Sequence, residues 1–252
     1  MEYKVDGIIK FYPTIKLKLD ATLDFTSPSG ARITLNSTND NDLAVGITLE
    51  ADSEADAIAI AEIELNRISD LLSYLHDIPI SGSGVTGMVT VSLTPEGKHI
   101  ITGETMLAID AILSLVKELE PQSIEELGYH LEKEYPPNFE DIASMWREAI
   151  STEAPALKYL LLYRLMEFLF GSSNIKELTE WIKAKEPSVQ IFPCNWRKRD
   201  ITVYTYLRDN IHRKQKQFPF REINNALPKL QNLVKQAIGE KLEGQQEDFG
   251  KI

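Results

Sequence analysis

The residue types best suited to chemistry lie together at residues 201–213, which read Ile-Thr-Val-Tyr-Thr-Tyr-Leu-Arg-Asp-Asn-Ile-His-Arg. A helical repeat of 100° per residue would place Tyr204 and Leu207 in one apolar stripe. Arg208 and His212 are four residues apart, so on this helix they would lie one turn apart at the edge of the stripe. There, both side chains could reach the same phosphate or carboxylate. A solvated helix face without a site fits the same spacing.

The charge around this segment sets it apart from the rest of the chain. The 252 residues carry a net charge of −11. Residues 1–150 contain 10 basic and 26 acidic residues, a net charge of −16, whereas residues 151–252 contain 17 and 12, a net charge of +5. Residues 197–221 alone contain eight basic and two acidic residues. Such a segment favours a polyanion, an acidic partner or the chain's own acidic half as the surface it meets.

Other reactive residue types are scattered. The four histidines fall in different segments, and no pair has the spacing of zinc ligands, so we expect no metal and no cofactor. The single cysteine, Cys194, cannot form an internal disulfide, which is typical of a reducing cytoplasm. The first residues lack a signal-peptide pattern, and the apolar run at residues 157–170 is short and interrupted by charges. We therefore expect a cytoplasmic protein without a membrane role.

Residues 1–103 predict an α+β domain built on an antiparallel sheet. Their strand-like segments are rich in Ile, Val, Leu, Thr and Phe and are separated by turn residues. The predicted strands are residues 7–11, 15–25, 31–36, 43–50, 85–93 and 100–102. Ser53 is placed to cap a helix whose apolar stripe would pack on the sheet. The Ser-Gly-Ser-Gly segment at residues 81–84 predicts a flexible turn.

From residue 105 onward the apolar spacing is that of helices. The predicted helices are residues 106–119, 124–134, 138–150, 156–170, 174–185, 201–213 and 221–242, with a loop at 188–200. Arg164 and Glu167, three residues apart in the most apolar of these helices, predict a partly buried ion pair. The resulting division is an α+β domain at 1–103, a helical connector at 104–137, an all-α bundle at 138–243 and a flexible tail at 244–252.

Residues 138–243 resemble the HEPN superfamily, all-helical domains found in many prokaryotic ribonucleases, toxins and defence proteins. The first motif that supports the resemblance is Tyr-Arg-Leu-Met-Glu at residues 163–167, inside the apolar helix. The other is Leu-Arg-Asp-Asn-Ile-His at residues 207–212, similar to the family's Arg-polar-spacer-His motif. Family nucleases usually hold a longer spacer than the three residues between Arg208 and His212. The β-rich front followed by a bundle also looks like bacterial proteins similar to the methylamine utilisation protein MauJ.

The HEPN resemblance implies metal-independent cleavage of RNA at a site completed across a homodimer. His212 would exchange a proton with the 2′-hydroxyl or the leaving oxygen, because an imidazole titrates near pH 6.5. Arg208 would neutralise the phosphoryl charge, Asp209 or Asn210 would orient one of the two, and Glu167 would hold an arginine in place. The residues expected to attract the RNA backbone are Arg197, Lys198, Arg199, Arg213, Lys214 and Lys216.

A second interpretation keeps the fold without the chemistry. In it, the bundle dimerises or binds an acidic protein, and the short Arg-to-His spacing reflects lost activity. In either case the acidic α+β domain would act as a sensor, a regulator or a surface for a protein partner. A third interpretation, an accessory role in amine metabolism, follows only from the MauJ-like layout.

Overall fold

The chain consists of two compact units, Met1–Tyr135 and Pro136–Ile252, each with its own buried apolar residues. The structure is a computed structural model. It describes residues 1–12, 15–17, 22–39, 42–91, 99–101, 117–119, 121–171, 174–194, 199–212 and 220–249. The mixed α+β class predicted from the sequence is confirmed.

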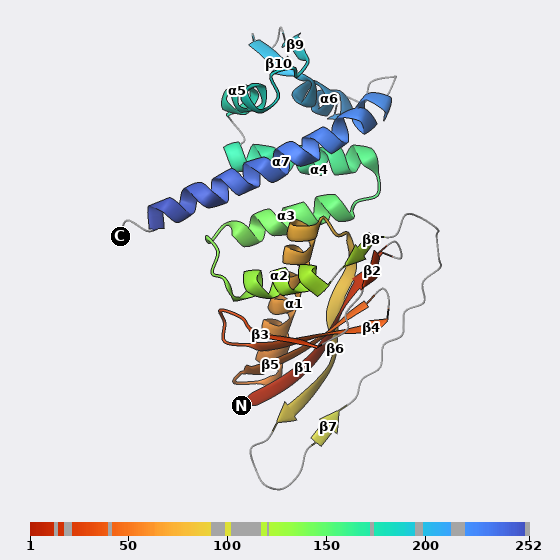
Figure 1. Ribbon diagram of the computed structural model, residues 1–252, viewed down its shortest axis with the longest axis vertical. Helices are drawn as coiled ribbons and strands as arrows, with labels where there is room; N and C mark the ends of the chain where they lie inside the picture. The colour runs from red at the N-terminus through yellow and green to blue at the C-terminus, as the bar shows by residue number, and fades with distance from the viewer. Residues whose placement is uncertain are drawn as a thin grey trace. The chain divides into compact units, whose positions relative to one another are not determined.

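The first unit is built on a sheet whose described strands run in the order β3-β4-β5-β1-β6-β7 (Figure 1). Its strands are β1 (Glu2–Phe11), β2 (Ile15–Leu17), β3 (Leu23–Thr26), β4 (Arg32–Asn39), β5 (Asp42–Glu50), β6 (Ile80–Val91), β7 (His99–Ile101) and β8 (Lys117–Leu119). Its helices are α1 (Glu54–His76) and α2 (Pro121–Glu132). All neighbours in the sheet are antiparallel, and β2 pairs with β8 in parallel. Because β5 and β6 both run antiparallel to β1, α1 links two parallel strands that have β1 between them.

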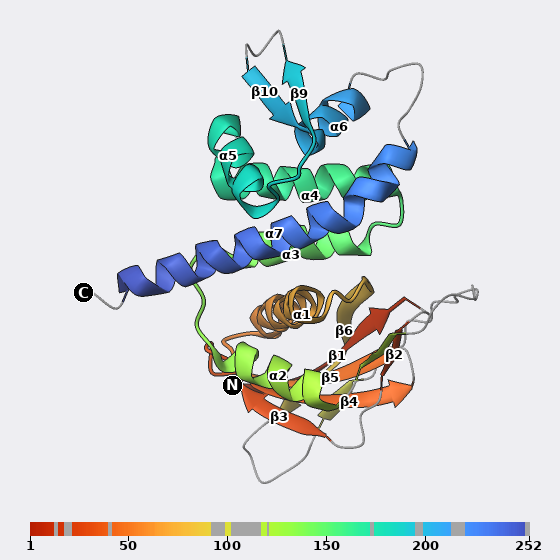
Figure 2. The ribbon, with the colours of Figure 1, turned by 45° about the horizontal axis from the view of Figure 1, so that its top comes forward.

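Helix α1 covers one face of this sheet (Figure 2). Alternate residues of β1 and β5 are buried, including Val5 and Ile47, which gives the sheet one apolar and one wetter face. The Ser53 cap is confirmed, since its Oγ accepts a hydrogen bond from the backbone nitrogen of Asp56 at 3.2 Å. Gly7 lets α1 approach closely: a Cβ there would lie 2.7 Å from Cδ1 of Leu65.

Several predictions for the first unit need correction. Residues 81–84 are not a turn but part of β6, which pairs with β1 along nearly its whole length. The predicted strand at residues 15–25 is divided into β2 and β3. Most of the predicted helix at residues 106–119 lies outside the described residues, and its end, Lys117–Leu119, is strand β8. Helix α2 begins at Pro121 and packs on α1 and β3, so it belongs to the first unit and not to a connector.

The second unit is organised around helix α4, which contacts α3, α5, α6 and α7. Its elements are α3 (Phe139–Ser151), α4 (Pro155–Phe170), α5 (Ile175–Lys185), β9 (Ile191–Cys194), β10 (Arg199–Thr202), α6 (Val203–His212) and α7 (Phe220–Phe249). The predicted end of this helix at residue 170 is confirmed, and Gly171 follows with a φ of 79° that favours glycine. Asn138 and Asn174, the first residues of two predicted helices, directly precede α3 and α5, and neither side chain makes a capping hydrogen bond.

The hairpin of β9 and β10 replaces the loop that we predicted at residues 188–200. Helix α6 consequently begins at Val203, because Ile201 and Thr202 are paired in β10. Helix α7 contains Pro228 and continues to Phe249, beyond the predicted end at residue 242. Among the described residues, no helix has both the length and the apolar character needed to cross a membrane.

Candidate functional site

Helix α6 is held against α4 by its buried side. Tyr204 and Leu207 are each 1% exposed, as the apolar stripe predicted. The backbone nitrogen of Thr205 donates to Oγ1 of Thr202 at 3.5 Å, which caps the first turn. The hydroxyl of Tyr159, on α4, donates to the backbone oxygen of Tyr204 at 2.9 Å. These contacts fix the rotation of α6 about its axis and so direct Arg208 towards α4.

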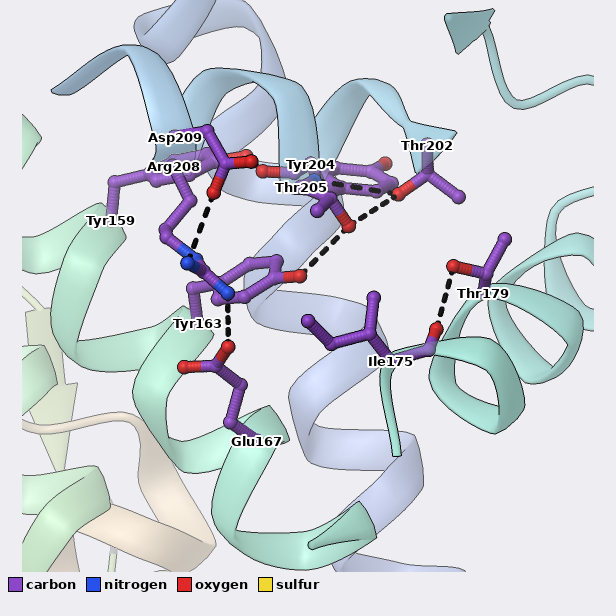
Figure 3. A network of polar contacts seen from close by, with 10 residues as sticks. All are labelled: Tyr159, Tyr163, Glu167, Ile175, Thr179, Thr202, Tyr204, Thr205, Arg208 and Asp209. Atoms are coloured by element: carbon purple, nitrogen blue, oxygen red, sulfur yellow. Dashed lines mark hydrogen bonds and ion pairs between the residues drawn. The ribbon is translucent and has the colours of Figure 1, made fainter. Parts of the chain in front are cut away.

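Arg208 is the centre of the polar network in Figure 3. Its Nη2 is paired with Glu167 of α4, and its Nη1 lies 3.0 Å from Oδ1 of Asp209. The guanidinium carbon lies 4.9 Å from the centroid of the Tyr163 ring, within the range of a cation–π contact. The Arg208 side chain is only 16% exposed, and its buried Nε has no hydrogen-bond partner among the described residues. The guanidinium is therefore held on three sides.

The Tyr163 ring beneath Arg208 is itself fixed. Its hydroxyl shares a hydrogen bond of 2.8 Å with Oγ1 of Thr205, which in turn lies 3.4 Å from Oγ1 of Thr202. Burial raises the pKa of Tyr163, and the hydrogen bond to Thr205 and the charge of Arg208 oppose this shift. The tyrosine consequently stays protonated at neutral pH and presents an uncharged ring to the guanidinium.

A cavity of about 530 Å³ lies between α3 and α4 beside this network. Its lining residues are Asp141, Ser144, Met145, Arg164, Glu167 and Phe168. Glu167 thus lines the cavity and also pairs with Arg208 of α6. The predicted ion pair between Arg164 and Glu167 is wrong, because the carboxylate reaches across to another helix while Arg164 is exposed at the cavity wall.

The structure brings together part of the predicted site. Arg208, Asp209 and Glu167 converge, whereas Asn210 is only 7% exposed and lies on the buried side of α6. His212 is the last residue of α6, so its backbone lies one turn beyond Arg208, and its side chain is outside the described residues.

The predicted RNA-binding residues are only partly described. Arg199 lies in β10, half-buried, and its Nε makes no hydrogen bond within the described part of the chain. The remaining five are outside the described residues: Arg197, Lys198, Arg213, Lys214 and Lys216. The attraction of the RNA backbone by these six residues therefore stays a prediction.

Two residues of the network, Tyr163 and Thr205, were given no role in the site from the sequence. A signal was present for both, since Tyr163 precedes Glu167 by four residues and Thr205 precedes Arg208 by three. Each pair therefore shares one face of its helix. The missing information was that these two faces meet, which depends on the packing of α6 on α4.

Chemically, the arrangement offers a fixed guanidinium whose positive charge is offset by two carboxylates at the edge of a cavity. Arginine in such a position can bind a phosphate once a carboxylate gives way, or can serve as a structural ion pair. In the described ranges, no three His, Cys, Asp or Glu side chains gather as a metal site would require. No protein-family model, curated protein or solved structure matches this chain, so its function is inferred from the residues around Arg208.

Proposed function

We propose that this protein acts on RNA through a HEPN-like module at residues 138–243, with metal-independent cleavage of the phosphodiester backbone as its reaction. The observation that carries the proposal is the fixed guanidinium of Arg208, one helical turn from His212 and beside a cavity wall. A preorganised cation stabilises charge that develops in a transition state better than a mobile one does, because no reorganisation is needed during the reaction.

In the proposed reaction the 2′-oxygen of the ribose forms a bond to phosphorus while the bond to the 5′-oxygen breaks. His212 accepts the proton of the 2′-hydroxyl or donates one to the leaving 5′-oxygen, and water makes the other proton transfer. Arg208 stabilises the phosphoryl charge. Glu167 and Asp209 orient Arg208. Asn210 is left out of this set because its side chain is buried. A homodimeric site, a cytoplasmic location and a prokaryotic defence or toxin setting belong to the same proposal.

The proposal is tested by incubating the purified protein with mixed RNA in EDTA. Arg208→Gln and His212→Ala should each lower the cleavage rate by roughly 100-fold or more, as is typical when a general acid–base group or a charge-stabilising group is removed. Arg32→Ala is the matched control, since this arginine is 68% exposed in the first unit and should leave cleavage unchanged. Circular dichroism verifies folding of each variant. Intact RNA with the unmodified protein, or cleavage that survives both substitutions, would reject the proposal.

A second candidate function is a non-catalytic interaction module. The observation that favours it is the pairing of Arg208 with two carboxylates, which leaves the cluster with a net negative charge and is typical of a structural network. Helix α4 also exposes apolar side chains at Leu157 (50%) and Phe168 (46%). These residues are 11 positions apart and therefore share one side of the helix.

This candidate predicts association without cleavage. Light scattering over a range of protein concentrations should then show a complex that Phe168→Ser weakens, while Arg208→Gln has no effect on RNA. Ile63→Ser is the control, because Ile63 is similarly exposed (60%) but lies on α1 of the first unit. A protein that stays monomeric at all concentrations would argue against self-association as the role of this surface.

A further inference from the structure

A second feature of α6 lies away from Arg208. Phe192 of β9 and Tyr206 of α6 form a parallel aromatic stack, with ring centroids 4.2 Å apart and an angle of 11° between the ring planes. Nearly parallel stacking at this spacing is one of the favoured arrangements of aromatic rings. Figure 2 shows the β9–β10 hairpin beside α6, as the contacts between these elements also require.

The stack lies at the surface, above buried residues of the hairpin. Phe192 is paired with Ile201 across the hairpin, and Ile201 is 3% exposed. Cys194, two residues from Phe192 and therefore on the same face of the strand, is 7% exposed. Tyr206, by contrast, is 37% exposed, and Phe192 is half-buried. The hairpin and α6 are thus held by the residues below, and Tyr206 is the more exposed ring of the pair.

Positive charge surrounds the stack in the sequence. Arg199 is paired with Cys194, so it projects from the same face of the hairpin as Phe192. The residues that follow β9 include Arg197 and Lys198, five and six positions after Phe192. Those that follow α6 begin with Arg213 and Lys214, seven and eight positions after Tyr206. Aromatic rings between basic segments are typical of surfaces that bind single-stranded nucleic acids.

We propose that the Phe192–Tyr206 pair is a platform on which a base of single-stranded RNA stacks, with the backbone phosphate held by Arg199. The choice of RNA rests on the proposed function, but the platform is separate from the Arg208 site. Tyr206 and Arg208 are two residues apart on α6, which places them about 200° apart around the helix axis. A strand bound at the platform would therefore lie on the other side of α6 and serve for capture, while Arg208 and His212 serve for cleavage.

The experiment measures the binding of a fluorescently labelled oligouridylate with 2′-O-methyl riboses, which lacks the hydroxyl needed for cleavage, by fluorescence anisotropy. Tyr206→Ala should weaken binding by roughly 10-fold, within the range for loss of one base–aromatic stack. Tyr206→Phe should bind as the unmodified protein does, because stacking needs the ring and not the hydroxyl. Tyr129→Ala is the matched control, since Tyr129 is 67% exposed on α2 of the first unit.

Salt dependence separates stacking from phosphate binding. Arg199→Ala should reduce the slope of log affinity against log salt concentration by about one phosphate contact, whereas Tyr206→Ala should leave this slope unchanged. An affinity that Tyr206→Ala does not change, or that Tyr206→Phe lowers as much as Tyr206→Ala does, would overturn the platform. If the platform fails while Arg208→Gln and His212→Ala still abolish cleavage, only this inference falls. If cleavage is absent but binding depends on Tyr206 as described, the platform stands without the nuclease.

Discussion

Each unit of the molecule contains a glutamate on a helix that meets an arginine, and the surroundings of these two glutamates differ. In the first unit, Glu64 of α1 is 3% exposed and accepts hydrogen bonds from Ser27 at 2.9 Å and Ser29 at 2.6 Å. Arg67 is at 3.8 Å. In the second unit, the Glu167 side chain is 23% exposed, lines a cavity and is paired with Arg208 on a different helix.

The difference separates a structural carboxylate from one that a ligand could replace. The hydroxyls around Glu64 tie the turn between β3 and β4 to α1 through Oε1. The buried Oε2 makes no hydrogen bond within the described residues and lies 3.8 Å from Nη1 of Arg67. Glu167 relies on Arg208, and it sits where an entering anion could compete for the guanidinium. Burial alone is therefore a poorer guide to function than the presence of an open volume beside the charged pair.

The largest effect is expected at alkaline pH, because the network around Arg208 in the second unit contains buried tyrosines. Burial raises the pKa of Tyr159, Tyr163 and Tyr204, whereas tyrosines of an unfolded chain ionise near pH 10. Above pH 10 the unfolded state loses protons that the folded state keeps, so the free energy of unfolding should fall with rising pH. For three such groups the slope is about 4 kcal/mol per pH unit.

Tryptophan fluorescence during urea unfolding between pH 9 and 11 measures this slope for the second unit, since all three tryptophans lie after residue 136. Tyr163→Phe should reduce the slope by about 1.4 kcal/mol per pH unit. Below pH 9 the free energy of unfolding should not depend on these groups. A slope that Tyr163→Phe leaves unchanged would show that this phenol already ionises in the folded protein.

Removing Arg208 and removing Arg67 should lower the free energy of unfolding by different amounts. Arg208→Ala leaves Glu167 and Asp209 without their shared cation and should lower the free energy of unfolding by about 3 kcal/mol. Arg67→Ala leaves Oε1 of Glu64 with its two hydroxyl donors and should cost less, about 1 kcal/mol. Fluorescence follows the first variant and circular dichroism the second. Equal costs would mean that the two carboxylates depend on their arginines to the same extent.

Neutralising Glu64 and neutralising Glu167 should affect RNA cleavage differently. Glu64→Gln keeps the shape of the side chain and should destabilise the first unit by about 1 kcal/mol, with no change in RNA cleavage or binding. Glu167→Gln removes the charge that orients Arg208 and should lower the rate of RNA cleavage. The measurements are thermal unfolding and the cleavage assay in parallel. Altered cleavage by Glu64→Gln at full folding would contradict a purely structural role for Glu64.

The smallest effect is expected at the rim of the second network. Lys229 is 65% exposed and lies 2.9 Å from Glu186, which also accepts a hydrogen bond from the hydroxyl of Tyr204 at 2.7 Å. Exposed ion pairs contribute little because water screens them, so Lys229→Ala should cost below about 0.5 kcal/mol in urea unfolding. A cost above about 1 kcal/mol would place Glu186 among the structural carboxylates.

Local pattern was sufficient for the elements that depend on neighbouring residues. The cap of α1 at Ser53 and the end of α4 at Phe170 follow from side chains and φ angles within one turn, and the sequence predicts both. The Gly-Ser-rich start of β6 predicts a turn, because those residues favour strands poorly. It is a strand because β1, about 70 residues earlier, supplies its hydrogen-bond partners, which no local pattern reveals.

The same limit applies to the candidate site. Spacing placed Arg208 on α6 and Glu167 on α4, but it offered Arg164 as the nearer partner of Glu167. The choice between the two arginines depends on how α6 packs against α4, which Tyr159 and Thr205 help to determine. Sequence spacing identifies which residues share a face of one helix, and it does not identify which faces meet.

The position of β1 between β5 and β6 has a consequence for how quickly each unit folds. The central strand of the first unit must wait for partners that follow it by roughly 40 and 80 residues, and chain entropy slows such distant pairings. The helices of the second unit include close neighbours in sequence, such as α3 and α4. In refolding from urea, fluorescence should therefore recover before the dichroism signal of the sheet.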